Sequence, residues 1–95
     1  MFRAGAIVTV RRAVEGYHLV DRGMLSTSVH IPLRPGDLIE YRGPHHGEQI
    51  VVRIPQKSAD QFLARVPKEL ERSWVDRSRF LVYLPKDAIV EFNDR

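Results

Sequence analysis

The chain contains no cysteine among its 95 residues. It can therefore form neither a disulfide framework nor a thiolate zinc site. This composition fits a reducing, intracellular setting, so we expect a cytoplasmic protein.

Long apolar runs are also absent. The longest N-terminal run, residues 5–10, is followed directly by Arg11 and Arg12. Such a run is too short for a signal-peptide core or a transmembrane helix. We expect no membrane partner.

Lysine is scarce, since only three of the fifteen basic residues are lysines, and the net charge is only +3. The planar guanidinium of arginine suits phosphate and carboxylate recognition better than the ammonium group of lysine. A GC-rich genome would also enrich arginine. The two halves of the chain carry similar mixtures of charge, so neither is a basic arm.

The length and composition are those of one small globular domain. The chain is 43% apolar and 28% charged, and a chain of this size buries roughly 60 to 70% of its unfolded surface. We expect residues 1–95 to form a single, almost fully ordered domain that is too small for an enclosed active-site cavity.

Alternating apolar and polar residues predict seven short strands. Residues 6–21 read as a hairpin that turns at Glu15 and Gly16. The turn residues Arg34 to Asp37 divide residues 31–41 into strand, turn and strand. Residues 82–92 repeat this pattern, as a weak internal duplication or as a second, independent hairpin. The seven strands are expected near residues 5–14, 17–21, 26–33, 38–42, 49–54, 80–84 and 88–92.

Between residues 58 and 74 the apolar period changes from two to nearly four, which indicates helix. Ser58 and Gln61 have the spacing of a capping box. Pro67 interrupts the pattern, so we expect two short helices, 58–66 and 68–74. The apolar stripe consists of Ala59, Phe62, Leu63, Val66, Leu70 and Trp74.

These elements predict a mainly β (β-rich α+β) fold, most economically a small SH3-like or OB-like barrel. It would have about six to seven short strands, with the proline-interrupted helical segment at 58–74 before the last two. An open sheet that dimerises through an edge is the alternative.

The loop formed by residues 42–48 concentrates polar groups between glycines. Acid–base catalysis there would need His45 and His46 as base and acid, but adjacent histidines in an extended loop are expected to point apart. The histidines are not spaced as metal ligands, and no activated nucleophile or phosphate-binding glycine loop is recognisable. We predict no catalytic residue, no metal and no cofactor.

Nucleic-acid binding has the broadest support, because arginines on or beside strands can contact phosphates while aromatic and imidazole rings stack on bases. Charged outward positions also serve solubility alone. The candidate residues are Arg11, Arg12, Arg22, Arg42, His45, His46 and Arg53.

Two segments resemble known families. Gly36-Asp37, Pro44 and Gly47-Glu48-Gln49 before the apolar residues 50–54 resemble the opening strand pair of MazF-type ribonuclease toxins. That resemblance implies an SH3-like barrel and a ribonuclease activity, although the arginine-proline that follows the Glu-Gln in that family is missing. Residues 50–55, leading into a helix, are similar to the start of ribbon-helix-helix DNA-binding proteins. Neither resemblance assigns a functional residue.

We therefore expect a non-enzymatic binding module for nucleic acid. The first alternative is a protein-interaction or regulatory module of the phage, plasmid or toxin–antitoxin type, in which exposed aromatics would form the contact patch. A MazF-like ribonuclease is the second alternative. A homodimer fits the first two hypotheses.

Overall fold

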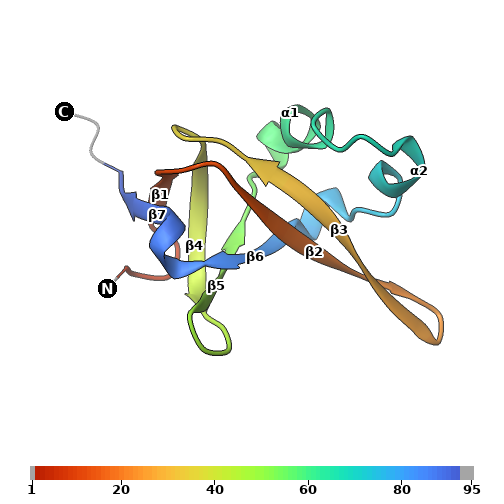
Figure 1. The fold of residues 1–95 in the computed structure, drawn as a ribbon, viewed down its shortest axis with the longest axis horizontal. Helices are drawn as coiled ribbons and strands as arrows, with labels where there is room; N and C mark the ends of the chain where they lie inside the picture. The colour runs from red at the N-terminus through yellow and green to blue at the C-terminus, as the bar shows by residue number, and fades with distance from the viewer. Residues whose placement is uncertain (1, 93–95) are drawn as a thin grey trace.

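The computed structural model describes residues 2–92, apart from the side chain of Arg22. These described residues form seven β-strands, with short helical segments before and after β6 (Figure 1). The elements, in order, are β1 (Ile7–Val10), β2 (Val14–Arg22), β3 (Leu25–Leu33), β4 (Leu38–Pro44), β5 (Gln49–Arg53), η1 (Gln56–Ser58), α1 (Ala59–Leu63), α2 (Glu69–Arg72), η2 (Arg77–Arg79), β6 (Leu81–Pro85), η3 (Lys86–Ala88) and β7 (Ile89–Glu91).

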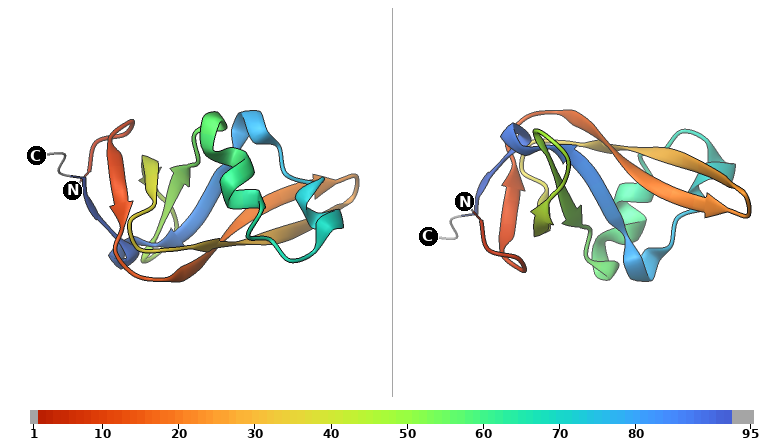
Figure 2. Two further views of the ribbon diagram at one scale, coloured as in Figure 1. Left: turned by 90° about the horizontal axis from the view of Figure 1, so that it is seen from above. Right: turned by 90° about the horizontal axis from the view of Figure 1, so that it is seen from below.

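The strands form one antiparallel sheet in the order β3-β2-β6-β5-β4-β1-β7. The prediction of a mainly β fold is confirmed. The sheet is not closed into a barrel, because β3 and β7 are its two ends and do not pair in the part of the chain that is described. Strong twist turns β1 and β7 across the direction of β2 and β3 (Figure 2), as expected of a right-handed twist that accumulates over many strands.

The core lies between the curved sheet and α1, which packs against β3 (Figure 2). Every second residue of β5 and β6 is buried, as the two-residue period of a strand requires. The largest fully buried side chains are Phe80, Ile31, Leu33, Ile39, Ile54, Leu84, Val8, Val10, Val29, Val52, Val66 and Val82.

The prediction that residues 6–21 form a hairpin is wrong. β1 pairs with β4 and β7, while β2 pairs with β3 and β6. Gly16 lies inside β2 and not in a turn. The absence of a side chain there lets Val82 pack against the β2 backbone. A Cβ at this position would lie 2.4 Å from Cγ1 of Val82.

Neither residues 31–41 nor residues 82–92 form a hairpin. The turn at Arg34 to Asp37 is present, with the Asp37 amide donating to the Arg34 carbonyl at 3.1 Å. It connects β3 to β4, which have no pairing with each other, and η3 likewise connects β6 to β7. Alternation along the chain shows where strands lie but does not identify their neighbours.

The helical segment is interrupted at Pro67, as predicted, and α1 and α2 lie on either side of it. The capping box is not formed, because the Ser58 side chain makes no capping hydrogen bond. The buried part of the apolar stripe ends at Val66, and Leu70 is 68% exposed. Among the described residues, no helix has the length and apolarity to cross a membrane.

Candidate nucleic-acid interface

One face of β4, β5, β6 and β2 turns away from the core, and we call it the outer face. In the register of β5 and β6, Val51 is paired with Tyr83 and Arg53 with Leu81. Strand alternation places all four side chains on the outer face. Tyr17 of β2 is paired with Tyr83 on the other side. The outer face therefore joins residues that are up to 66 positions apart in the sequence.

Three arginines surround a pocket of about 500 Å³ on the outer face, which we call the arginine pocket. Arg42 comes from β4, Arg53 from β5 and Arg79 from η2. Arg42 lies where the register of β4 and β5 shifts between Tyr41 and Gly43. A bulge of this kind can redirect a side chain.

Two guanidiniums of this pocket, those of Arg42 and Arg53, are only loosely held. Arg42 Nη1 donates to Glu40 Oε1 at 2.9 Å, with nearly half of the arginine side chain exposed. Arg53 Nη2 donates to the Ser78 carbonyl at a long 3.4 Å. Exposed pairs of this kind contribute about 0–1 kcal/mol. An anionic ligand could therefore replace them at small cost.

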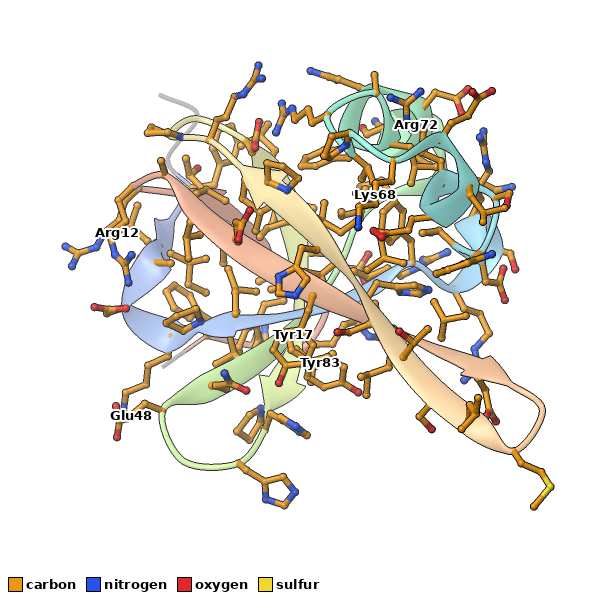
Figure 3. All side chains as sticks on the ribbon, turned by 45° about the vertical axis from the view of Figure 1, so that its right-hand side comes forward. Arg12, Tyr17, Glu48, Lys68, Arg72 and Tyr83 are labelled. Atoms are coloured by element: carbon orange, nitrogen blue, oxygen red, sulfur yellow. The ribbon has the colours of Figure 1, made fainter. Side chains whose placement is uncertain are left out.

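A cluster of rings lies beside the arginine pocket. The Tyr17 and Tyr83 rings are stacked, with centroids 5.3 Å apart and planes at 24°, and both residues lie at the centre of Figure 3. The His45 ring also lies against Tyr83, with the two ring centroids 4.4 Å apart. The Tyr17 hydroxyl donates to Oε1 of Gln49 at 2.8 Å and fixes the ring. We call Tyr17, Tyr83 and His45 the aromatic cluster.

His45 and His46 do not point apart, contrary to the sequence-based expectation. Their ring centroids are 4.6 Å apart. The β4–β5 loop is tight, with Gln49 N donating to the His46 carbonyl and His45 N to the Gln49 carbonyl. Gly47 permits this turn because its φ is +60°.

A second pocket, of about 380 Å³, opens between β2, β6 and the segment 74–79, and we call it the His18 pocket. It shares Arg79 and Leu81 with the arginine pocket, so the two are contiguous. Among the described residues, Tyr17 and Tyr83 are the only pair in register between β2 and β6. Next to that pair, His18 Nδ1 lies 2.8 Å from the Leu81 carbonyl. Farther along, β2 and β6 diverge, and the pocket lies in the space between them.

Asp76 adds a negative charge to the His18 pocket. Ser78 donates to Oδ1 of Asp76 from its hydroxyl at 2.7 Å and from its amide at 3.0 Å. These hydrogen bonds, first that of the hydroxyl, lower the pKa of Asp76 below its ordinary value. The carboxylate is therefore ionised at neutral pH.

The structure brings together only part of the predicted binding residues. Arg42 and Arg53 line one pocket, and His45 with the exposed His46 lies at the adjoining loop. Arg11 and Arg12 bind Asp87 instead, through its carbonyl and, at 2.8 Å, its carboxylate. Figure 3 shows Arg12 well apart from Tyr17 and Tyr83. Arg22 ends β2, and its side chain lies outside the described part of the chain.

Sequence reasoning did not assign Tyr83 or Arg79 to this site. The alternation of residues 80–84 predicts a strand that contains Tyr83, but it does not predict that this strand lies between β2 and β5. Arg79 directly precedes the apolar residues 80–84. A basic residue at a strand end is the only signal that could have identified it.

The described residues contain no group of three histidine, aspartate or glutamate side chains placed to hold a metal ion. The outer face offers guanidinium donors, ring faces and apolar contacts. Comparisons with protein-family models, with curated proteins and with solved structures found no match.

Proposed function

We propose that the protein binds single-stranded nucleic acid across the outer face. The observation that carries this proposal is the meeting of three arginines from separate segments at one pocket beside the aromatic cluster. Guanidiniums bind phosphate oxygens bidentately, and ring faces stack on bases with about 1–3 kcal/mol per base.

Single strands suit this surface better than duplexes. The bases of a duplex already stack on each other, whereas unpaired bases can turn toward protein rings. The excess of positive charge is modest, at +3 for the chain, so aromatic contacts must supply much of the affinity. A cytoplasmic location would give the protein access to such strands.

Fluorescence anisotropy with labelled 12-nucleotide probes tests the proposal. Single- and double-stranded DNA and RNA are titrated over a range of salt concentrations. About three phosphate contacts predict that log affinity falls with log salt at a slope of about −2 for a single strand. No binding at low salt, or binding without salt dependence, contradicts the proposal. Cleavage of the RNA probe during the titration would instead favour the MazF-like ribonuclease.

A second candidate function is a protein interaction at the opposite end of the sheet. Leu38 and Val90 flank Thr9 in register, and together with Ile7 they leave apolar side chains about 40% exposed. The short edge strand β7 adjoins this patch and could pair with its own copy. A homodimer that sedimentation velocity detects, and that Leu38→Lys dissociates, would support this function.

A further inference from the structure

The His18 pocket contains a buried histidine, and the hydrogen bonds of the described residues use only one of its two ring nitrogens. His18 is 5% exposed, and its ring packs edge-on against Phe80 at 5.4 Å. Because Nδ1 donates to the Leu81 carbonyl, the neutral ring carries its lone pair on Nε2.

The His18 Nε2 atom reaches the pocket. No protein hydrogen bond to it exists among the described residues, and these contain no fully buried side-chain nitrogen or oxygen without a partner. Since His18 lines the pocket, its free acceptor opens into that space.

Among the described residues, the pocket lining includes charged groups of both signs. Asp21 and Asp76 offer carboxylate acceptors, and Arg79 offers guanidinium donors at the border with the arginine pocket. An occupant must therefore present hydrogen-bond donors on one edge and acceptors on another.

We propose that the His18 pocket takes one guanine base of a bound single strand, while the adjoining arginine pocket takes a phosphate of the same strand. This inference rests on the proposed function and specifies its sequence preference. Guanine presents N1–H and an exocyclic amino group on one edge, which suit the carboxylates and His18 Nε2. On the other edge O6 and N7 accept from arginine, the commonest base-specific contact of this residue.

The remaining bases satisfy the pocket less well. Uracil and thymine have no amino group and only one ring N–H, so they would supply fewer donors than the acceptors of the pocket can bind, namely the two carboxylates and the buried His18. Adenine and cytosine have an amino group but no adjacent ring N–H. The volume of the His18 pocket, about 380 Å³, lies within the range of small-ligand sites and agrees with this assignment.

Four labelled RNA hexamers test the inference. They are identical uridine strands except at the third position, which carries G, A, C or U, so their phosphates are the same. We expect the G hexamer to bind about tenfold more tightly than the all-uridine hexamer. Trp74, the single tryptophan of the chain, lines the pocket, and its fluorescence should change most with the G hexamer.

A double variant separates base recognition from charge. Asp21→Asn with Asp76→Asn keeps the side-chain oxygen that accepts from Ser78, so η2 should be retained. We expect the preference for G to fall below about threefold, while affinity for the all-uridine hexamer rises because two negative charges are removed.

The outcomes distinguish the two proposals. Equal affinity for all four hexamers, with unchanged tryptophan fluorescence, overturns the guanine pocket but leaves single-strand binding intact. An unaltered preference in the double variant also overturns it. No binding of any hexamer overturns both.

Discussion

Arg65 and Asp37 form a nearly buried ion pair that fastens the segment after α1 to the β3–β4 turn. Two guanidinium nitrogens of Arg65 donate to the two carboxylate oxygens at 2.6 and 3.0 Å. Only about a tenth of each side chain is exposed. Arg65 Nη1 also lies 3.2 Å from the Pro32 carbonyl, and the guanidinium lies over the Phe62 ring. The pair therefore closes the helical side of the core.

Removing Arg65 should destabilise the fold strongly, because Asp37 is left with an uncompensated, largely buried charge. We expect Arg65→Met to lower the free energy of unfolding by about 3–5 kcal/mol, measured by urea denaturation. The matched control is Arg77→Met, which breaks the exposed pair with Asp60 on α1 and should cost about 0–1 kcal/mol. Similar losses in both variants would contradict the assigned role.

Asp37 should also make stability depend on acid pH. Burial raises its pKa, but hydrogen bonds from Arg65 and the Arg34 amide, with the charges of both arginines, outweigh burial and hold the pKa of Asp37 below its ordinary value. A carboxyl whose pKa is lowered by folding stabilises the protein above its unfolded pKa of about 3.9. That stability is lost as the pH falls through the folded pKa.

The measurement is the free energy of unfolding between about pH 2 and 6. Wild type should lose stability steeply below about pH 4, and Asp37→Asn should show a shallower slope. Part of the slope should persist in the variant, because hydrogen bonds from Ser78 and Arg12 lower the pKa of Asp76 and Asp87, respectively. Identical slopes would show that Asp37 does not titrate as described.

Gly16 should not tolerate a methyl group. An added Cβ would lie 2.4 Å from Val82 Cγ1 and 3.1 Å from the Tyr83 carbonyl. Although alanine is usually better than glycine in a strand, we expect Gly16→Ala to destabilise by about 1–3 kcal/mol. In a double-mutant cycle with Val82→Ala, which removes the clashing atom, the combined loss should be smaller than the sum. Strict additivity would show that the contact is absent.

Aromatic stacking by Tyr83 can be tested without changing charge. Tyr83→Leu keeps an apolar side chain at this position, so we expect the strand to remain. Single-strand affinity should fall about 5- to 100-fold, as expected for the loss of one stacked base. Phe92→Leu, which changes a partly exposed aromatic near Phe2 and Ile7 at the other end of the sheet, is the control. Equal effects of the two changes on anisotropy titrations would argue against the aromatic cluster.

Much of the local structure could be predicted from the sequence. The alternation in residues 49–54 and 80–84 predicts β5 and β6 with their buried residues, and Pro67 predicts the helix break. These features depend on neighbouring residues alone. Strand partners depend on contacts between distant segments, so the insertion of β6 between β2 and β5 had no local signature.

The dependence on distant contacts also explains why the candidate site was only partly predicted. Arg42 and His45 lie close together in sequence, and hairpin pairing adds Arg53. Arg79 and Tyr83 reach the outer face only through the order of the sheet. Arg11 and Arg12 were indistinguishable from the others in sequence, and only the structure shows that Asp87 of η3 holds them.

The most direct test of single-strand binding compares two variants with the same net charge. Arg53→Gln with Arg79→Gln removes two guanidiniums from the arginine pocket, and Arg11→Gln with Arg12→Gln removes two that bind Asp87. Anisotropy titration of a 12-nucleotide single strand should show at least about a tenfold loss for the first variant, with a salt slope shallower by about 1.4, and little change for the second. Equal losses in both variants would mean that net charge alone drives binding and would contradict the interface described above.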